Sequence, residues 1–130
     1  MKLPSVVVYN LLMESDELAE HMDLDHIFTM FIPDDFQKVE EAPLIRICDL
    51  DEYRSEWVDN SAIAVDISVQ VDIWCGVNDL TRLSEIRTIV DNLLAENHWQ
   101  QYASTTDRDP EFDLVRVARR YRATQYIDLV

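Results

Sequence analysis

The sequence predicts an α+β protein, with two helices packed on one face of a four-stranded, mostly antiparallel sheet in the order α-β-β-β-α-β. Segment 64–75, AVDISVQVDIWC, alternates apolar and polar residues, as a strand with one buried face does. Segment 78–97 repeats leucine, isoleucine and valine at helical spacing. The length of 130 residues, of which 48% are hydrophobic, suits one folded domain over residues 1–130.

The N-terminal third predicts a broken helix and two strands. Segment 4–13, PSVVVYNLLM, begins with a proline suited to the first helical turn, and Ser15 is expected to restart the helix. The apolar run at 27–32 stops before a proline, and the mixed run at 44–50 follows another. We expect these two strands to pair as antiparallel neighbours with the third.

The third strand is expected at the centre of the sheet. Its odd residues, Val65 to Ile73, form one apolar face, and Asp66 and Asp72 lie on the other. Six residues separate these two aspartates by roughly 20 Å along a strand, so they cannot share a metal or act as a catalytic pair. The following helix has Asn78 or Asp79 as its N-cap and ends near Asn97.

The last strand is expected from about Leu114 to Asp128, and its direction is left open by the pattern. At Arg119 and Arg120 two adjacent arginines would point to opposite faces, so we expect a β-bulge there. The preceding acidic stretch, 105–113, lacks the glycine and glutamate spacing of a calcium loop and predicts a charged turn.

Charge is distributed unevenly along the chain. The formal net charge of -15 repels nucleic acid and anionic membranes, yet four of the eleven cations fall within seven residues: Arg116, Arg119, Arg120 and Arg122. Segment 48–61 is acidic and carries Tyr53 and Trp57, residue types that are enriched at protein interfaces. Two interpretations stay open, an interface or a fold-back of Trp57 onto the sheet edge.

No residue pattern predicts catalysis. No Gly-x-Ser-x-Gly motif is present, and a single glycine cannot build a phosphate-binding loop. Segment 21–26, HMDLDH, matches no closed metal site and is interpreted as a solvated loop, and Cys48 and Cys75 are expected to be free, buried thiols. We therefore expect a soluble, non-secreted protein that is not an enzyme and has no catalytic, cofactor or metal residues.

The order of these segments resembles a known family. IFTMFIPDDF, then PLIRI, VDISVQVDIWC, the amphipathic helix and finally RVARRYRAT are similar, in order and spacing over nearly the whole chain, to tail-completion or tail-terminator proteins of long-tailed bacteriophages. The resemblance implies a structural subunit of a ring, usually hexameric, which caps the tail tube and faces the head connector. It implies no catalytic residues, a place in the virion tail, and assembly in the host bacterial cytoplasm.

The resemblance also suggests an interface. Asp66 and Asp72 are expected to meet the arginines of segment 116–122, within one subunit or, as we favour, across a subunit boundary. A head-to-tail ring needs two unlike patches, and an acidic strand face meeting a basic strand provides them. DNA would at most pass through the channel. The alternative is a small acidic inhibitor that mimics DNA and blocks a nucleic-acid-binding enzyme, although the arginines interrupt such a surface.

Overall fold

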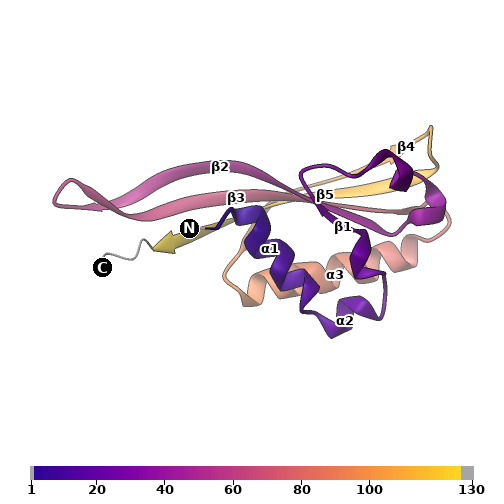
Figure 1. The fold of residues 1–130 in the computed structure, drawn as a ribbon, viewed down its shortest axis with the longest axis horizontal. Coiled ribbons are helices and arrows are strands. Elements are labelled where there is room, and N and C mark those ends of the chain that lie inside the picture. The colour runs from indigo at the N-terminus through magenta and orange to yellow at the C-terminus, as the bar shows by residue number, and fades with distance from the viewer. Residues whose placement is uncertain (1, 127–130) are drawn as a thin grey trace.

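The computed structural model describes residues 2–126 as a five-stranded sheet with helices (Figure 1). The strands follow the spatial order β1-β2-β3-β5-β4. The strand bounds are Ile27–Thr29 (β1), Leu44–Val58 (β2), Ser61–Gly76 (β3), Gln100–Asp109 (β4) and Leu114–Tyr126 (β5). The helices are Pro4–Met13 (α1), Asp16–Ala19 (α2) and Leu80–Glu96 (α3), with short 3-10 turns at Leu24–His26, Asp34–Phe36 and Val39–Glu41.

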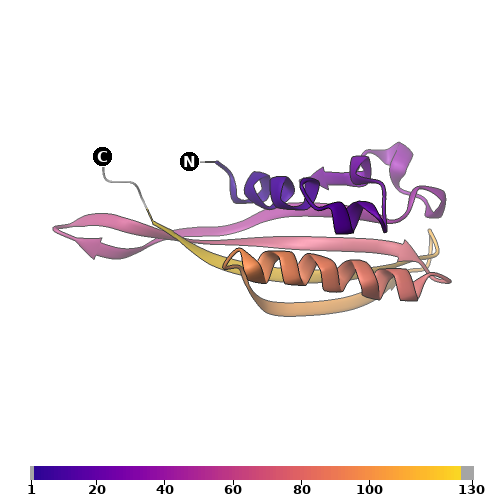
Figure 2. The ribbon, with the colours of Figure 1, turned by 90° about the horizontal axis from the view of Figure 1, so that it is seen from below.

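The helices cover one face of the sheet and leave the other open. In Figure 1 the sheet forms one layer and α1 and α3 lie below it, and Figure 2 shows these two helices side by side. The predicted α+β class and the placement of both long helices on one face are confirmed. We call the opposite face of the sheet the open face.

The core lies between the sheet and the helices. The predicted apolar face of β3 is buried there, from Val65 to Ile73. From the helices, Val8, Leu12, Ile86 and Leu94 are fully buried against it. The helix predicted at 78–97 is confirmed as α3, between Asp79 as N-cap and Asn97 as C-cap.

The break in the N-terminal helix is also confirmed. Helix α1 ends at Met13, and the Ser15 hydroxyl accepts a hydrogen bond from the Leu18 amide at 3.1 Å, which caps α2. At the other end of α1, the Asp49 carboxylate accepts hydrogen bonds from the Ser5 amide (2.8 Å) and hydroxyl (2.6 Å). A carboxylate at a helix N-terminus satisfies amides that have no partner within the helix, so Asp49 fixes α1 to the sheet.

The expected strand count and one pairing direction are wrong. Segment 100–109 forms a fifth strand, β4, which pairs along β5, so the charged turn predicted at 105–113 is confined to residues 110–113. Strand β1 pairs with β2 in parallel, so the first two strands are not antiparallel neighbours. Between these strands the chain passes through two 3-10 turns and returns to the end of the sheet where β1 begins, as a parallel pairing requires.

The predicted bulge at Arg119 and Arg120 is wrong. Strand β5 pairs with β3 in unbroken antiparallel register from Ala64↔Tyr126 to Gly76↔Leu114, which also settles the direction of β5. The irregularity lies instead on β4, between Gln101 and Ala103. The two arginines do point to opposite faces, and each has partners there. Of the predicted strand end at 128, residues beyond 126 lie outside the described part of the chain.

Strands β2 and β3 form a long hairpin that extends beyond the helices (Figure 1). We call residues 51–63 the arm. The arm ends in a two-residue turn at Asp59 and Asn60, whose φ angles of 48° and 66° fit a type I′ turn. An extra residue in β2 between Asp49 and Glu52 shifts the register at its base. Strand β2 is therefore much longer than the predicted 44–50.

No helix among the described residues is long and apolar enough to cross a membrane.

Candidate interaction surface

The open face brings six of the eight predicted interface residues onto one sheet surface. Because β3 and β5 pair in register, Gln70 lies opposite Arg120 and Ser68 opposite Arg122. The predicted residues on this surface of β3 and β5 are Asp66, Asp72, Arg116, Arg120 and Arg122. The sixth is Tyr53 of β2, which lies opposite Asp66 at the base of the arm and lines the same hollow as Arg122. Arg119 points to the helix side, and Trp57 lies further along the arm.

Asp72 is the centre of a charge network inside one subunit. Its side chain is fully buried, and its Oδ2 accepts from Arg46 Nη2 at 2.7 Å and Arg46 Nε at 3.0 Å. Its Oδ1 accepts from Gln70 Nε2 at 2.9 Å and lies 3.7 Å from Arg116 Nη1. A buried carboxylate needs such partners to be retained without water. Asp72 therefore matches the intrasubunit alternative, and its charge is already compensated within the chain.

Arg116 links Asp72 to the edge of the sheet. Its Nη2 and Nε donate to the two oxygens of Asp107 on β4, at 2.6 and 3.1 Å. This bidentate bond, with smaller attractions from Asp107 and Asp72, raises the pKa of Arg116 despite its partial burial. Arg46, on the other side of Asp72, stacks over Trp74 at 5.2 Å from the ring centroid. The network therefore spans four strands, from β2 to β4.

Asp66 meets hydroxyl groups instead of arginines. Its Oδ1 accepts from Thr124 Oγ1 at 2.7 Å and from Ser55 Oγ at 3.2 Å. No ion pair involves Asp66 among residues 2–126. The two aspartates of β3 thus have different environments, although they share one strand face.

Arg119 acts on the helix side of the sheet. Its Nη1 lies 3.1 Å from Asp91 Oδ1 of α3, and the Tyr121 hydroxyl donates to the same oxygen at 3.1 Å. Burial, and secondarily the Asp91 charge, raises the pKa of Tyr121. Arg119 therefore fixes α3 to the sheet, which leaves three of the four clustered arginines on the open face.

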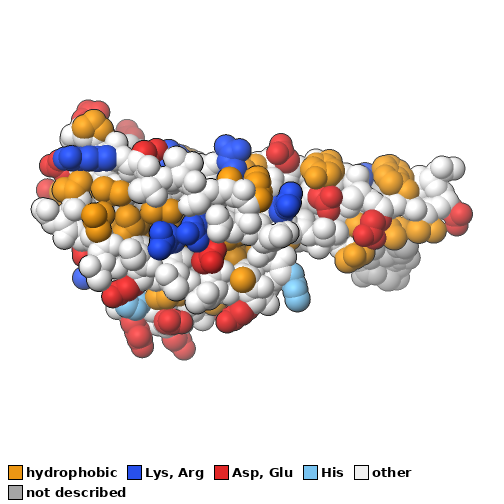
Figure 3. Space-filling view, turned by 180° about the vertical axis from the view of Figure 1, so that it is seen from behind, with side chains coloured by type: hydrophobic (Ala, Val, Ile, Leu, Met, Phe, Trp, Pro, Cys, Tyr) orange, Lys and Arg blue, Asp and Glu red, His pale blue; other side chains and the backbone are white. Residues whose placement is uncertain are grey.

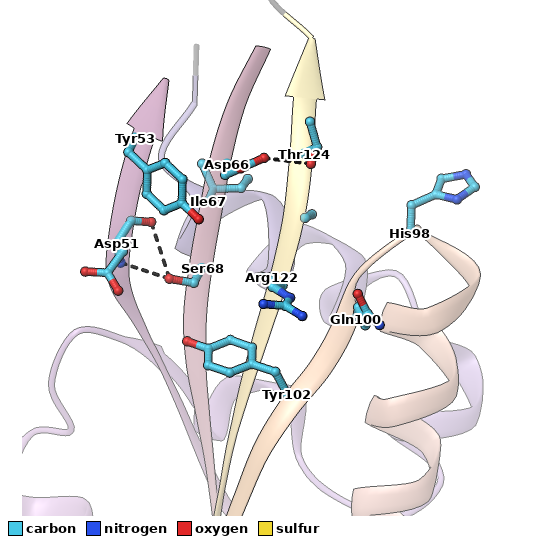
Figure 4. A pocket seen from close by; sticks show the side chains of 11 residues that line it. Asp51, Tyr53, Asp66, Ile67, Ser68, His98, Gln100, Tyr102, Arg122 and Thr124 are labelled. Atoms are coloured by element: carbon cyan, nitrogen blue, oxygen red, sulfur yellow. Dashed lines mark hydrogen bonds between the residues drawn. The ribbon is translucent and has the colours of Figure 1, made fainter. Parts of the chain in front are cut away.

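Arg120 and Arg122 are exposed and have no carboxylate partner within the described chain. Arg120 Nε donates to Gln70 Oε1 at 3.1 Å, and Arg122 stacks over Tyr102 at 5.4 Å from the ring centroid. Arg122 lies in an open hollow of about 590 Å³ at the base of the arm. Figure 4 shows Arg122 between Ser68 and Gln100, with Tyr102 below it and Tyr53 across the hollow.

The arm presents apolar and acidic side chains to solvent. Tyr53 and Trp57 are each 61% exposed, and hydrophobic and acidic side chains gather along the arm in Figure 3. Trp57 therefore does not fold back onto the sheet edge, which was the alternative to an interface. The exposure supports the interface interpretation, and the binding role of the eight residues stays a prediction.

The two cysteines and His26 are the other candidates for reactive or metal-binding groups. The Cys48 thiol is half-buried and Cys75 is buried, and both are free; burial raises the pKa of Cys75 to about 12 and also raises that of Cys48. His26 Nδ1 lies 2.7 Å from the Glu41 carbonyl oxygen. Within residues 2–126, no three histidine, cysteine, aspartate or glutamate side chains gather closely enough to hold a metal.

Sequence reasoning missed Arg46, Gln70, Asp91 and Tyr102. Arg46 carried a signal, because it stands between two buried isoleucines of β2 and so had to share the face of Asp72. Asp91 and Tyr102 carried none, since their roles depend on the packing of α3 and on the unexpected strand β4.

A solved structure has the same fold as this chain. It is a chain of the structure titled "Virion of native gene transfer agent (GTA) particle", which matches with a TM-score of 0.69 over 96% of both chains at 12% sequence identity. No protein-family model matches the sequence. A search of curated proteins finds no match. At such low identity the likeness shows the fold alone.

Proposed function

We propose that this chain is a structural virion protein, a tail terminator or tail-completion subunit that forms a ring, hexameric by the family resemblance, at the end of a phage tail tube. The observation that carries the proposal is the fold match to a chain of a virion particle over 96% of both chains. A match over nearly all of both chains means that the overall fold is alike. The role is structural, not catalytic.

The open face and the arm support an assembly role. Exposed aromatic residues and arginines without carboxylate partners are typical of protein interfaces. The partners would be further copies of the chain, the tail-tube protein and the head-tail connector proteins. The protein would be assembled in the host bacterial cytoplasm and reside in the virion tail, with DNA at most passing through the ring.

Deletion of the gene from its phage or particle-producing host tests this proposal. Negative-stain electron microscopy should show unjoined heads and tails, and tails longer than those of the parent strain. A plasmid-borne copy should restore joined particles with tails of the parental length. Joined particles of normal tail length from the deletion strain would contradict the proposal.

The DNA-mimic inhibitor is less well supported. A mimic needs carboxylates on one exposed face at phosphate-like spacing, and the open face displays Arg120 and Arg122. A salt-sensitive complex with a basic host enzyme, in place of self-association, would favour this second function.

A further inference from the structure

Two features of the molecule are uncovered within the described chain. One is the aromatic side of the arm, and the other is the hollow that holds Arg122. The hollow lies at the base of the arm, where Asp51 and Tyr53 line it, whereas Trp57 and Val58 lie close to the tip of the arm.

The arm carries apolar anchors and negative charge together. Trp57 and Val58 are 61% and 51% exposed close to its tip. Four carboxylates and one cation lie in the same segment: Asp51, Glu52, Glu56, Asp59 and Arg54. A large aromatic residue surrounded by charges is the usual composition of a binding anchor with a polar rim.

The hollow offers a cation and an aromatic ring on its β5 and β4 side, where Arg122 and Tyr102 lie, whereas Asp51 and Asp66 line its β2 and β3 side. Arg122 is exposed, lies over the Tyr102 ring, and has no carboxylate partner among the described residues. Arg120, two residues earlier on the same face, is bound only to the neutral side chain of Gln70. A guanidinium stacked on a tyrosine is held in a fixed orientation and can receive a carboxylate at its edge and an aromatic ring on its free face. The volume of about 590 Å³ is larger than an indole ring requires.

The arm cannot fill the hollow of its own chain. Tyr53 lines the hollow, and Trp57 lies four residues further along the same strand, a distance of roughly 13 Å. The β2–β3 ladder continues to Val58↔Ser61, so bringing Trp57 back would break the backbone pairing of the arm. An arm that fills this hollow must therefore belong to another molecule.

We propose that the arm of one copy lies across the open face of a second copy, with Trp57 in the hollow beside Arg122 and with Glu56 and Asp59 near Arg120 and Arg122. This inference rests on the proposed function, since it gives the ring its subunit contact. The arm and the hollow are unlike surfaces, so each copy offers one and accepts the other. Such a head-to-tail contact repeats around a closed ring.

Engineered cysteines test which surfaces meet. In a Cys48→Ser background, Val58→Cys with Gln100→Cys places one thiol on the arm beside the intact Trp57 and one at the hollow, while Cys75 stays buried. Oxidation should give a ladder of covalent oligomers on a non-reducing gel, and each single variant should give dimers at most. A matched control, Val58→Cys with Thr88→Cys, moves the second thiol to the exposed side of α3 and should give no ladder.

Charge reversal tests the same contact without a covalent bond. Arg120→Glu with Arg122→Glu should weaken self-association at least tenfold, measured by light scattering after size exclusion. Adding Glu56→Arg and Asp59→Arg to that chain restores the opposite charges and should recover the oligomer. Arg87→Glu, which changes an arginine of α3, should leave the mass unchanged.

The outcomes separate this inference from the proposed function. A ring-sized wild type without a cysteine ladder would overturn the inference and leave the proposed function standing. A ladder together with normal tails in the deletion strain would overturn the proposed function and keep the contact. A monomer at every concentration, with no ladder from the double variant, would overturn the inference.

Discussion

The body of the sheet and the arm are continuous parts of the same two strands, yet they differ in what covers them. In the body, helices α1 and α3 bury one face of β2 and β3, and the Asp72 network neutralises charge on the other. In the arm, Tyr53 and Trp57 are mostly exposed and the carboxylates have almost no cations beside them. Similar strand patterns therefore stabilise the fold in one region and leave aromatic and acidic side chains exposed in the other.

The largest expected difference is between the alkylation rates of two thiols in the body, Cys75 on the helix side and Cys48 on the open face. Cys75 lies in the body at 0% exposure and its pKa is raised to about 12, so alkylation requires unfolding of the sheet. Since native domains are stable by at least about 5 kcal/mol, iodoacetamide at pH 8 should modify Cys48 at least about 1,000-fold faster than Cys75. Mass spectrometry of timed samples measures both rates. Equal rates in the folded protein would show that the helix face is open.

The same pKa shift predicts an alkaline loss of stability. Burial raises the folded pKa of Cys75 above its ordinary 9.0, so the neutral thiol contributes stability that is fully present below pH 9. That contribution is lost as the pH rises from 9 to about 12, because the unfolded chain releases the proton first. Urea unfolding measures this: between pH 8 and pH 10.5 the free energy of unfolding should fall less for Cys75→Ala than for the wild type.

Removing core volume should weaken the body strongly. Ile86→Ala deletes a fully buried side chain from α3 and should lower the free energy of unfolding by about 4 kcal/mol through lost burial and a cavity. Urea unfolding followed by circular dichroism measures the change. A loss below about 1 kcal/mol would contradict the position of α3 against the sheet.

The two aspartates of β3 offer a matched comparison. Asp72→Asn leaves Arg46 and Arg116 without their shared carboxylate and should destabilise the fold by about 3 kcal/mol. Asp66→Asn keeps a carbonyl oxygen for Thr124 and Ser55 and should cost about 1 kcal/mol or less. The same unfolding assay ranks the two variants, and an equal cost would contradict the network around Asp72.

The smallest effect on folding is expected at the arm. Trp57→Ser should change the free energy of unfolding of the monomer by less than about 0.5 kcal/mol, because the side chain contributes little to the core. The same variant should lose self-association in light scattering. A large loss of stability with intact assembly would reverse the contrast between body and arm.

The sequence predicted the elements whose pattern is local. Helix α3, the broken N-terminal helix and the buried face of β3 follow from spacing alone, and the structure confirms them. Strand β4 was missed because its residues are polar, and only pairing with β5 makes segment 100–109 a strand. The parallel direction of β1 was missed because three residues carry no directional signal.

The site was predicted as a set of residues but not as a set of contacts. Alternation placed Asp72 on a polar face, while its burial and its partner Arg46 depend on the neighbouring strand. The cluster at 116–122 divides between two faces, since Arg119 binds Asp91 of α3. Composition predicted an interface role for Tyr53 and Trp57, and the structure adds that the described chain leaves them exposed.

Hydroxyl-radical footprinting tests most directly whether another copy covers the arm. In a single copy of the chain Trp57 is 61% exposed and Trp99 is 5% exposed. Mass spectrometry can follow the oxidation of both residues in one sample, with Trp99 as the internal control. We expect Trp57 to oxidise rapidly in dilute monomer and severalfold more slowly in the oligomer, with Trp99 slow in both. Equal oxidation of Trp57 in the monomer and the oligomer would contradict the account.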